Sequence, residues 1–235
     1  MKTRELEEIE PMENTKKRVL IIDDHVVVRQ GLTSLINLEP DLMVCGQSED
    51  AQKGLSEIEK SRPDIVLLDI SLPGMNGIEF LKNAKARYPD VPVIVLSMHD
   101  ESLYAERALR AGALGYLMKS SSSDEVVSAL RKVLKGEYHL SGGAGGAMLR
   151  KFLGNRPKAA ESPVSALSDR ELEVFEMTGR GKTTRQIAEA LHLSIKTIDA
   201  HKMHIKEKLK LSSATELIQH AVRYVETELL ARPVA

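Results

Sequence analysis

The sequence predicts an α/β protein in which a (βα)₅ domain precedes a small, all-α helix-turn-helix domain. Two observations support the first domain: five short apolar runs alternate with stretches of helical periodicity, and each of four runs ends abruptly at polar residues. Such uniformly apolar, β-branched runs are typical of central strands in a parallel sheet buried on both faces. A third observation separates the second domain, because the residues after about 165 show only helical periodicity.

The elements of the first domain follow from where each pattern starts and stops. Strands are expected near residues 18–23, 42–47, 64–69, 92–97 and 114–118, and helices near 25–38, 51–60, 77–87, 101–111 and 123–135. Right-handed crossovers between parallel strands place helices on both faces of the sheet.

The second domain is expected to contain four helices. Ser168 can cap the first helix, with Glu171 completing a capping box. Thr183 or Thr184 opens the second helix, and Ser194 opens a long third helix that a fourth follows. Two helices joined by a short turn, the second with a basic face, indicate a helix-turn-helix.

These patterns divide the chain into an N-terminal tail (1–16), the first domain (17–138), a flexible linker (139–164) and the second domain (165–230). The linker contains Ser-Gly-Gly-Ala-Gly-Gly at 141–146, which lacks the preceding strand that a phosphate-binding loop needs. The single cysteine, Cys45, excludes an intramolecular disulfide and fits a reducing cytosol. No apolar stretch approaches the length of a membrane span, so we expect a cytoplasmic protein with no membrane partner.

Charge is unevenly distributed along the chain. Residues 1–140 carry 18 basic and 23 acidic side chains, whereas residues 177–212 carry 8 basic and 3 acidic ones. This asymmetry suits metal binding in the first domain and polyanion binding in the second.

Five polar residues stand where apolar runs end: Asp23, Asp24, Asp69, Ser97 and Lys119. Because the carboxyl ends of parallel strands meet at one edge of the sheet, these side chains are expected to converge there. Three carboxylates crowded together need a divalent cation, and hard oxygen ligands of this kind favour Mg²⁺.

This set of residues resembles the receiver domain of two-component response regulators, a flavodoxin-like fold, over residues 17–136. The resemblance implies that Asp69 accepts a phosphoryl group from a phosphohistidine of a partner sensor histidine kinase. It also implies that Asp24, Asp69 and the main-chain carbonyl of Ser71 ligate Mg²⁺, and that Asp23 holds a metal-bound water.

By the same resemblance, Ser97 and Lys119 bind the phosphoryl oxygens, and Tyr116 is the aromatic switch residue three positions before the lysine. Phosphoryl transfer needs mostly positioning and charge neutralisation, which a metal ion and a lysine supply.

The second domain carries the pattern Ile187-Ala188-x-x-Leu191-x-Leu193-Ser194-x-x-Thr197-Ile198-x-x-His201, followed by Ile205-x-x-Lys208-Leu209. This pattern resembles the LuxR-type helix-turn-helix, and with the receiver ahead of it the chain resembles the NarL/FixJ class of response regulators. The resemblance implies that the third helix enters the major groove of double-stranded DNA and that the fourth forms a homodimer upon phosphorylation. RNA polymerase is a further expected partner.

The side chains expected at the DNA are Lys196, Thr197, Asp199, Ala200, Lys202, Met203 and Lys206. The lysines would mainly contact phosphates, which sets affinity and register. Asp199, Ala200 and Met203 fall where the family reads base edges: the carboxylate can accept from cytosine N4 or adenine N6, and the apolar side chains favour the thymine methyl.

We therefore expect a phosphorylation-dependent transcriptional regulator rather than an enzyme, although the receiver catalyses its own phosphorylation. One alternative is a DNA-binding regulator that works without phosphorylation and uses its receiver fold only for protein interaction. A second is a flavodoxin-like flavin or nucleotide enzyme, which the scarcity of aromatic residues disfavours.

Overall fold

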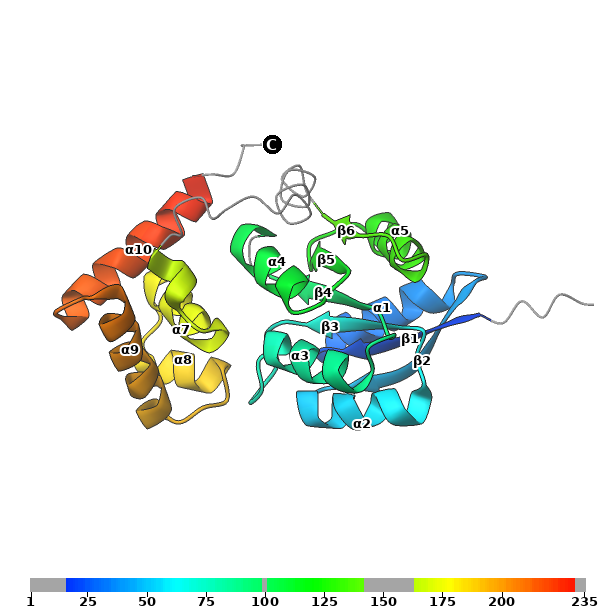
Figure 1. The fold of residues 1–235 in the computed structure, drawn as a ribbon, viewed down its shortest axis with the longest axis horizontal. Coiled ribbons are helices and arrows are strands. Elements are labelled where there is room, and N and C mark those ends of the chain that lie inside the picture. The colour runs from blue at the N-terminus through cyan, green and yellow to red at the C-terminus, as the bar shows by residue number, and fades with distance from the viewer. Residues whose placement is uncertain (1–15, 99–100, 142–162, 231–235) are drawn as a thin grey trace, which may run out of the picture.

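The computed structural model describes residues 16–98, 101–141 and 163–230, which form an α/β part and a helical part (Figure 1). Nearly all of the expected N-terminal tail and most of the expected linker lie outside these residues. No helix in the described ranges is both long enough and apolar enough to cross a bilayer.

The first part is built on a parallel sheet. In the described residues its strands are β1 (Lys17–Ile22), β2 (Leu42–Ser48), β3 (Ile65–Asp69), β4 (Val93–Ser97), β5 (Gly115–Met118) and β6 (His139–Leu140), arranged in the order β2-β1-β3-β4-β5-β6. The first five are the strands expected from the apolar runs. The sixth, which pairs with β5, is an addition, because two residues are too few to give a periodic signal.

Helices cover both faces of this sheet, as the sequence predicted. The helices are α1 (Val26–Asn37), α2 (Ala51–Ser61), α3 (Gly77–Arg87), α4 (Glu101–Arg110) and α5 (Ser123–Leu134). Alternation along β1 separates two cores: Val19 and Ile21 pack with α1 and α5, whereas Leu20 and Ile22 pack with α2, α3 and α4. All four side chains are fully buried, which explains why the run is apolar without alternation.

The second part contains the helices expected of a helix-turn-helix domain. Its elements are the 3₁₀ helix η1 (Pro163–Ala166) and the α-helices α7 (Asp169–Gly179), α8 (Thr184–Ala190), α9 (Ile195–Leu209) and α10 (Ala214–Leu230). Ser168 and Glu171 form the expected capping box on α7, and Thr183 caps α8 in the same way. Ser194 caps α9 by accepting a hydrogen bond from the backbone N–H of Thr197.

The two parts pack against each other through α7, which lies between the α/β part and α9 in Figure 1. One continuous hydrophobic cluster includes Tyr104 and Ala105 of α4 together with Val164 and Leu167 before α7. Consequently α9 keeps an exposed face, on which Met203 is 49% exposed.

Candidate functional site

The polar residues at the strand ends converge on the carboxyl edge of the sheet. Asp69 ends β3 and Ser97 ends β4, while Asp23 follows β1 and Lys119 follows β5. The backbone N–H of Lys119 donates to the carbonyl of Ser97 at 2.7 Å, which fixes the start of the lysine loop against β4. Parallel pairing is therefore what brings together residues that are up to 96 positions apart in the chain.

Lys119 lies between two buried carboxylates. Its Nζ atom is 2.6 Å from Asp69 Oδ2 and 2.8 Å from Asp23 Oδ2. The three side chains are 5%, 1% and 0% exposed for Lys119, Asp69 and Asp23, respectively. Water therefore screens these charges little, and one ammonium group faces two carboxylates in a medium of low dielectric constant.

Burial and neighbouring charges shift the pKa values of both Asp69 and Lys119. Burial is the largest effect on Asp69 and raises the pKa of its carboxyl group; the charge of Asp23 raises that pKa further, and Lys119 opposes both. For Lys119, burial alone lowers the pKa, but the carboxylates of Asp69 and Asp23 outweigh it and raise the pKa of the ammonium group. The cluster therefore carries excess negative charge that a further cation would offset.

The acidic residues fit a divalent cation. Asp23, Asp24, His25 and Asp69 place one potential ligand atom each within 4.8 Å of one another. Asp23 Oδ2 lies 2.8 Å from Lys119 Nζ, and Asp24 Oδ1 lies 2.6 Å from His25 Nδ1. A carboxylate oxygen has more lone pairs than one such contact uses, so both oxygens can also serve as metal ligands. Carboxylate oxygens of this kind suit Mg²⁺. The backbone N–H of Ser71 donates to Asp69 Oδ1 at 3.0 Å, which keeps that residue beside the cluster.

His25 belongs to this site although the sequence analysis did not include it. Its Nδ1 atom is 2.6 Å from Asp24 Oδ1, 3.3 Å from Asp23 Oδ1 and 3.4 Å from Lys119 Nζ. The imidazole is 59% exposed and thus lies on the solvent side of the cluster. Its position directly after the aspartate pair was the available signal.

Ser97 and Tyr116 lie inside the protein. Ser97 is fully buried at the end of β4, and Tyr116 is fully buried in β5, where it joins the hydrophobic core shared with α3 and α4. Tyr116 pairs with Val95 across β4 and β5.

The expected DNA-binding residues on α9 fall into two groups. Lys196, Asp199 and Met203 are exposed, whereas Thr197, Ala200, Lys202 and Lys206 are partly buried. Thr197 Oγ1 contacts the hydroxyl of Ser194 at 2.7 Å, and Lys202 Nζ donates to Thr184 Oγ1 at 2.8 Å. Burial lowers the pKa of Lys202. Lys202 thus joins α9 to α8, whereas the Thr197 contact stays within the N-terminal cap of α9.

Two family models match the chain. Residues 19–131 match the response regulator receiver domain, and residues 165–221 match the bacterial regulatory proteins of the luxR family. The chain belongs to the two-component response regulators. The response regulator is 32% identical to the oxygen regulatory protein NreC of Staphylococcus carnosus over 210 residues, which cover 88% of this chain and 97% of NreC. It is 30% identical to the transcriptional regulatory protein DegU of Brevibacillus brevis, with 91% and 96% of the two chains covered.

Solved structures agree with this assignment. RcsB from Salmonella enterica serovar Typhimurium, bound to the promoter rprA in the presence of the phosphomimetic BeF₃⁻, matches with a TM-score of 0.59 and 25% identity over 88% of this chain and 98% of that chain. The expected family, the expected fold class and the combination of a receiver with a LuxR-type DNA-binding domain are confirmed. The relatives named above are regulators, in line with a role in transcription.

Proposed function

We propose that this response regulator accepts a phosphoryl group on Asp69 from a phosphohistidine of a partner sensor histidine kinase and then binds DNA as a homodimer. The observation that carries the proposal is the buried cluster in which Lys119 lies 2.6 Å from Asp69 and 2.8 Å from Asp23. An ion pair that served only the stability of the fold would need one carboxylate beside Lys119. The second carboxylate and the adjacent Asp24 are ligands in excess, as a phosphoryl-transfer site with a metal ion requires.

In the transfer, a carboxylate oxygen of Asp69 attacks phosphorus and forms a P–O bond. The P–N bond to the kinase imidazole breaks, its electron pair stays on the leaving nitrogen, and that nitrogen takes up a proton. Mg²⁺, which Asp24, Asp69 and the carbonyl of Ser71 would hold directly and Asp23 through water, supplies charge neutralisation when bound. Lys119 offsets the charge of the phosphoryl oxygens, and the hydroxyl of Ser97 donates to them.

The acyl phosphate then changes the surface of the receiver. Its new charge draws Ser97 and Lys119 toward the phosphoryl group. The buried Tyr116, three positions before Lys119, would shift with them, so that the surface around α4 and β5 is remodelled. This is a two-state change driven by local electrostatics.

The DNA-binding part would place α9 in the major groove and use α10 for dimerisation. Lys196 and Lys206 would contact phosphates, and Lys202, held by Thr184, would do so after a small reorientation. The exposed Asp199 and Met203, with Ala200 and Thr197, would face the base edges. We further propose a cytoplasmic location, contact with RNA polymerase at the promoter and no enzymatic role beyond the receiver's own phosphoryl chemistry.

Regulation without phosphorylation is the alternative. It would not explain why three carboxylates gather around one ammonium group at the sheet edge, since buried negative charge in excess of its cations destabilises the fold.

Phosphorylation of the purified full chain tests the proposal. Incubation with a small phosphodonor, such as acetyl phosphate, and Mg²⁺ should give one base-labile phosphoryl group, mapped to Asp69 by mass spectrometry. Asp69→Asn should abolish it. Asp90→Asn, which changes an exposed aspartate outside the cluster, is the matched control and should label like wild type. Labelling of Asp69→Asn to the wild-type level would exclude Asp69 as the acceptor.

A further inference from the structure

Strand β6 lies beside β5, the strand that leads to Lys119 (Figure 1). The preceding helix α5 ends at Leu134, and Gly136 follows in the left-handed region with a φ of 81°. The N–H of Gly136 donates to the carbonyl of Val133, and the N–H of Glu137 donates to that of Lys132, which is the pattern of a Schellman motif. Glycine at this position lets the chain reverse after the helix and pair with β5.

The pairing of β6 with β5 is a regular ladder that ends at Ser141. The N–H of His139 donates to the carbonyl of Leu114 at 3.0 Å, and the N–H of Ser141 donates to that of Tyr116 at 3.1 Å. At the next step of a parallel ladder, an N–H of β5 would donate to a main-chain carbonyl. Here the N–H of Met118 donates to the hydroxyl oxygen of Ser141 at 3.3 Å. The side chain of Ser141 therefore completes the ladder in place of the backbone.

This bond holds the backbone immediately before Lys119. Met118 is the last residue of β5, and the N–H of Lys119, on the other side of the strand, donates to the carbonyl of Ser97 at 2.7 Å. The end of β5 is thus held by β4 on one side and by Ser141 on the other. Because Lys119 Nζ lies 2.6 and 2.8 Å from two buried carboxylates, a shift of this backbone would move the ammonium group away from them.

Ser141 comes from a segment that is itself fixed. The side chain of Leu140 packs against the hydrophobic cluster that contains Tyr116. His139 Nε2 lies 3.8 Å from a carboxylate oxygen of Glu125 on α5. Ser141 is only 4% exposed, so its bond to β5 is shielded from water.

We propose that Ser141 is a positioning residue for phosphoryl transfer, because its hydroxyl holds the end of β5 where Lys119 reaches Asp69. Ser141 follows α5 and lies beyond residue 131, where the match to the receiver domain ends. A residue outside the (βα)₅ repeat, at the start of the segment that leads to the DNA-binding part, thus completes the support of the site. This inference rests on the proposed role of Asp69 as phosphoryl acceptor.

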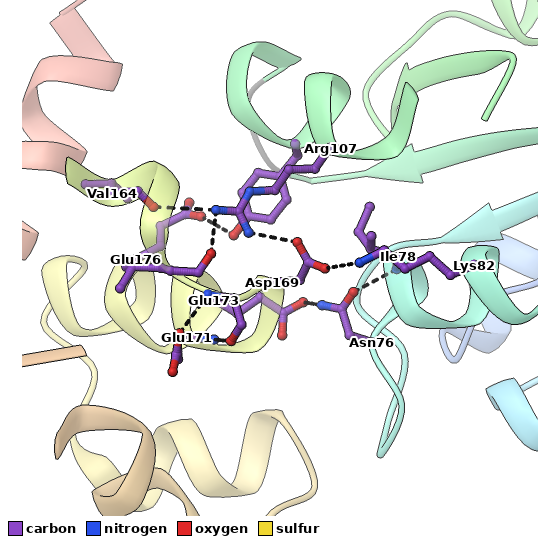
Figure 2. Close-up of polar contacts among 12 residues, drawn as sticks. Asn76, Ile78, Lys82, Arg107, Val164, Asp169, Glu171, Glu173 and Glu176 are labelled. Carbon is purple, nitrogen blue, oxygen red and sulfur yellow. Dashed lines mark hydrogen bonds and ion pairs between the residues drawn. The ribbon is translucent and has the colours of Figure 1, made fainter. Parts of the chain in front are cut away.

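Packing between the two parts is a separate influence on the receiver. It involves α7, whose Arg170 donates to the carbonyl of Gly74 at 2.6 Å and whose Asp169 accepts from Arg107 of α4 at 2.7 Å (Figure 2). The Ser141 hydroxyl acts instead on β5. Its effect should therefore be the same in wild type and in an Arg107→Ala background, and a double-mutant cycle separates the two influences.

The test compares initial rates of Asp69 phosphorylation by acetyl phosphate, at saturating Mg²⁺, in the full chain. Ser141→Ala should slow the reaction on the order of tenfold, the factor that corresponds to one lost hydrogen bond. Ser141→Thr keeps the hydroxyl and should restore most of the rate. Ser61→Ala is the matched control and should equal wild type, because Ser61 is 6% exposed and its hydroxyl bonds to a backbone carbonyl within α2.

Calorimetric titration with Mg²⁺ distinguishes the position of Lys119 from a general loosening of the site. An ammonium group cannot ligate the ion, and one that is held less firmly competes less for the carboxylates. Ser141→Ala should therefore bind Mg²⁺ at least as tightly as wild type although it reacts more slowly. A partly unfolded site would lose both properties.

Three results would overturn the positioning role and leave the acceptor assignment intact, provided that Asp69 is labelled. They are equal rates for wild type and Ser141→Ala, a slow Ser141→Ala that has also lost Mg²⁺ affinity, and an effect of Ser141→Ala that disappears in the Arg107→Ala background. Absence of label at Asp69 in every protein would instead refute the proposed function.

Discussion

Removal of the Lys119 ammonium group should strongly destabilise the receiver. Lys119 is the cation paired with Asp69 and Asp23, whose side chains are 1% and 0% exposed. Lys119→Ala leaves two carboxylates facing each other in a buried place. The cost of removing one partner from a buried ion pair is about 3–5 kcal/mol. Asp69, whose pKa is already raised by burial, can take up a proton, so we expect the lower end, about 3 kcal/mol, at neutral pH.

The matched control is Lys53→Ala. Lys53 also contacts two carboxylates, those of Glu49 and Asp50, but it is 66% exposed. Water screens exposed pairs of this kind, so they contribute little to stability. The two variants thus differ in burial rather than in the number of partners.

Urea unfolding of the full chain, followed by circular dichroism in the presence of EDTA, measures both effects. Because the chain has two parts, the receiver transition is fitted separately. Added Mg²⁺ should return more stability to Lys119→Ala than to wild type, since the metal offsets the same carboxylates. A loss in Lys119→Ala no larger than that in Lys53→Ala would contradict the buried charge cluster.

Three further predictions concern the metal, pH and DNA. Asp24→Asn should weaken Mg²⁺ binding strongly in a calorimetric titration, and unchanged affinity would exclude Asp24 as a ligand. Because the pKa of Asp69 is raised, the folded state holds the proton of this carboxyl group more tightly than the unfolded chain does, and ionisation of Asp69 lowers the stability of the fold as pH rises. Asp69→Asn should therefore be more stable than wild type at pH 7. This gain in stability should shrink as the pH is lowered toward 3.8, the ordinary pKa of aspartate. Asp41→Asn should behave oppositely, because Arg131 lowers the pKa of Asp41. Lys206→Ala should weaken binding to every DNA duplex and flatten the salt dependence of that binding. Asp199→Ala or Met203→Ala should instead change which DNA sequence is preferred, with a loss of ~1–3 kcal/mol in binding free energy per base contact. If selection from random DNA gave the same sequence for wild type and both replacements, α9 would hold DNA by its charge alone.

The strands and their ends could be predicted from the sequence because a parallel central strand must be apolar on both faces. Val19 to Ile22 form such a run, and the first polar residue after it marks the sheet edge. Because the strands are parallel, their carboxyl ends place Asp69 and Lys119 at the same edge of the sheet. This could be predicted without knowing any side-chain contact. The helix caps at Ser168 and Ser194 were equally predictable, since a cap is a local interaction within four residues.

Contacts between the two parts could not be predicted in this way. Arg170 and Gly74 are 96 residues apart, and Glu173 has the sequence character of a solvated helix residue although the receiver buries it. No periodicity encodes which face of α7 meets another domain. Lys202 is similar: its place among helix lysines suggests a free cation, whereas packing of α9 on α8 directs it to Thr184.

The central claim is that phosphorylation of Asp69 controls DNA binding by this chain. Its most direct test is the affinity for a duplex with two half-sites about one helical turn apart, chosen by selection from random DNA, with a single half-site as control. Treatment with acetyl phosphate and Mg²⁺ should tighten binding of wild type to the paired site far more than to the single site, and should leave Asp69→Asn unchanged. Equal affinity of treated and untreated wild type for the paired site, with Asp69 fully phosphorylated by mass, would contradict the account.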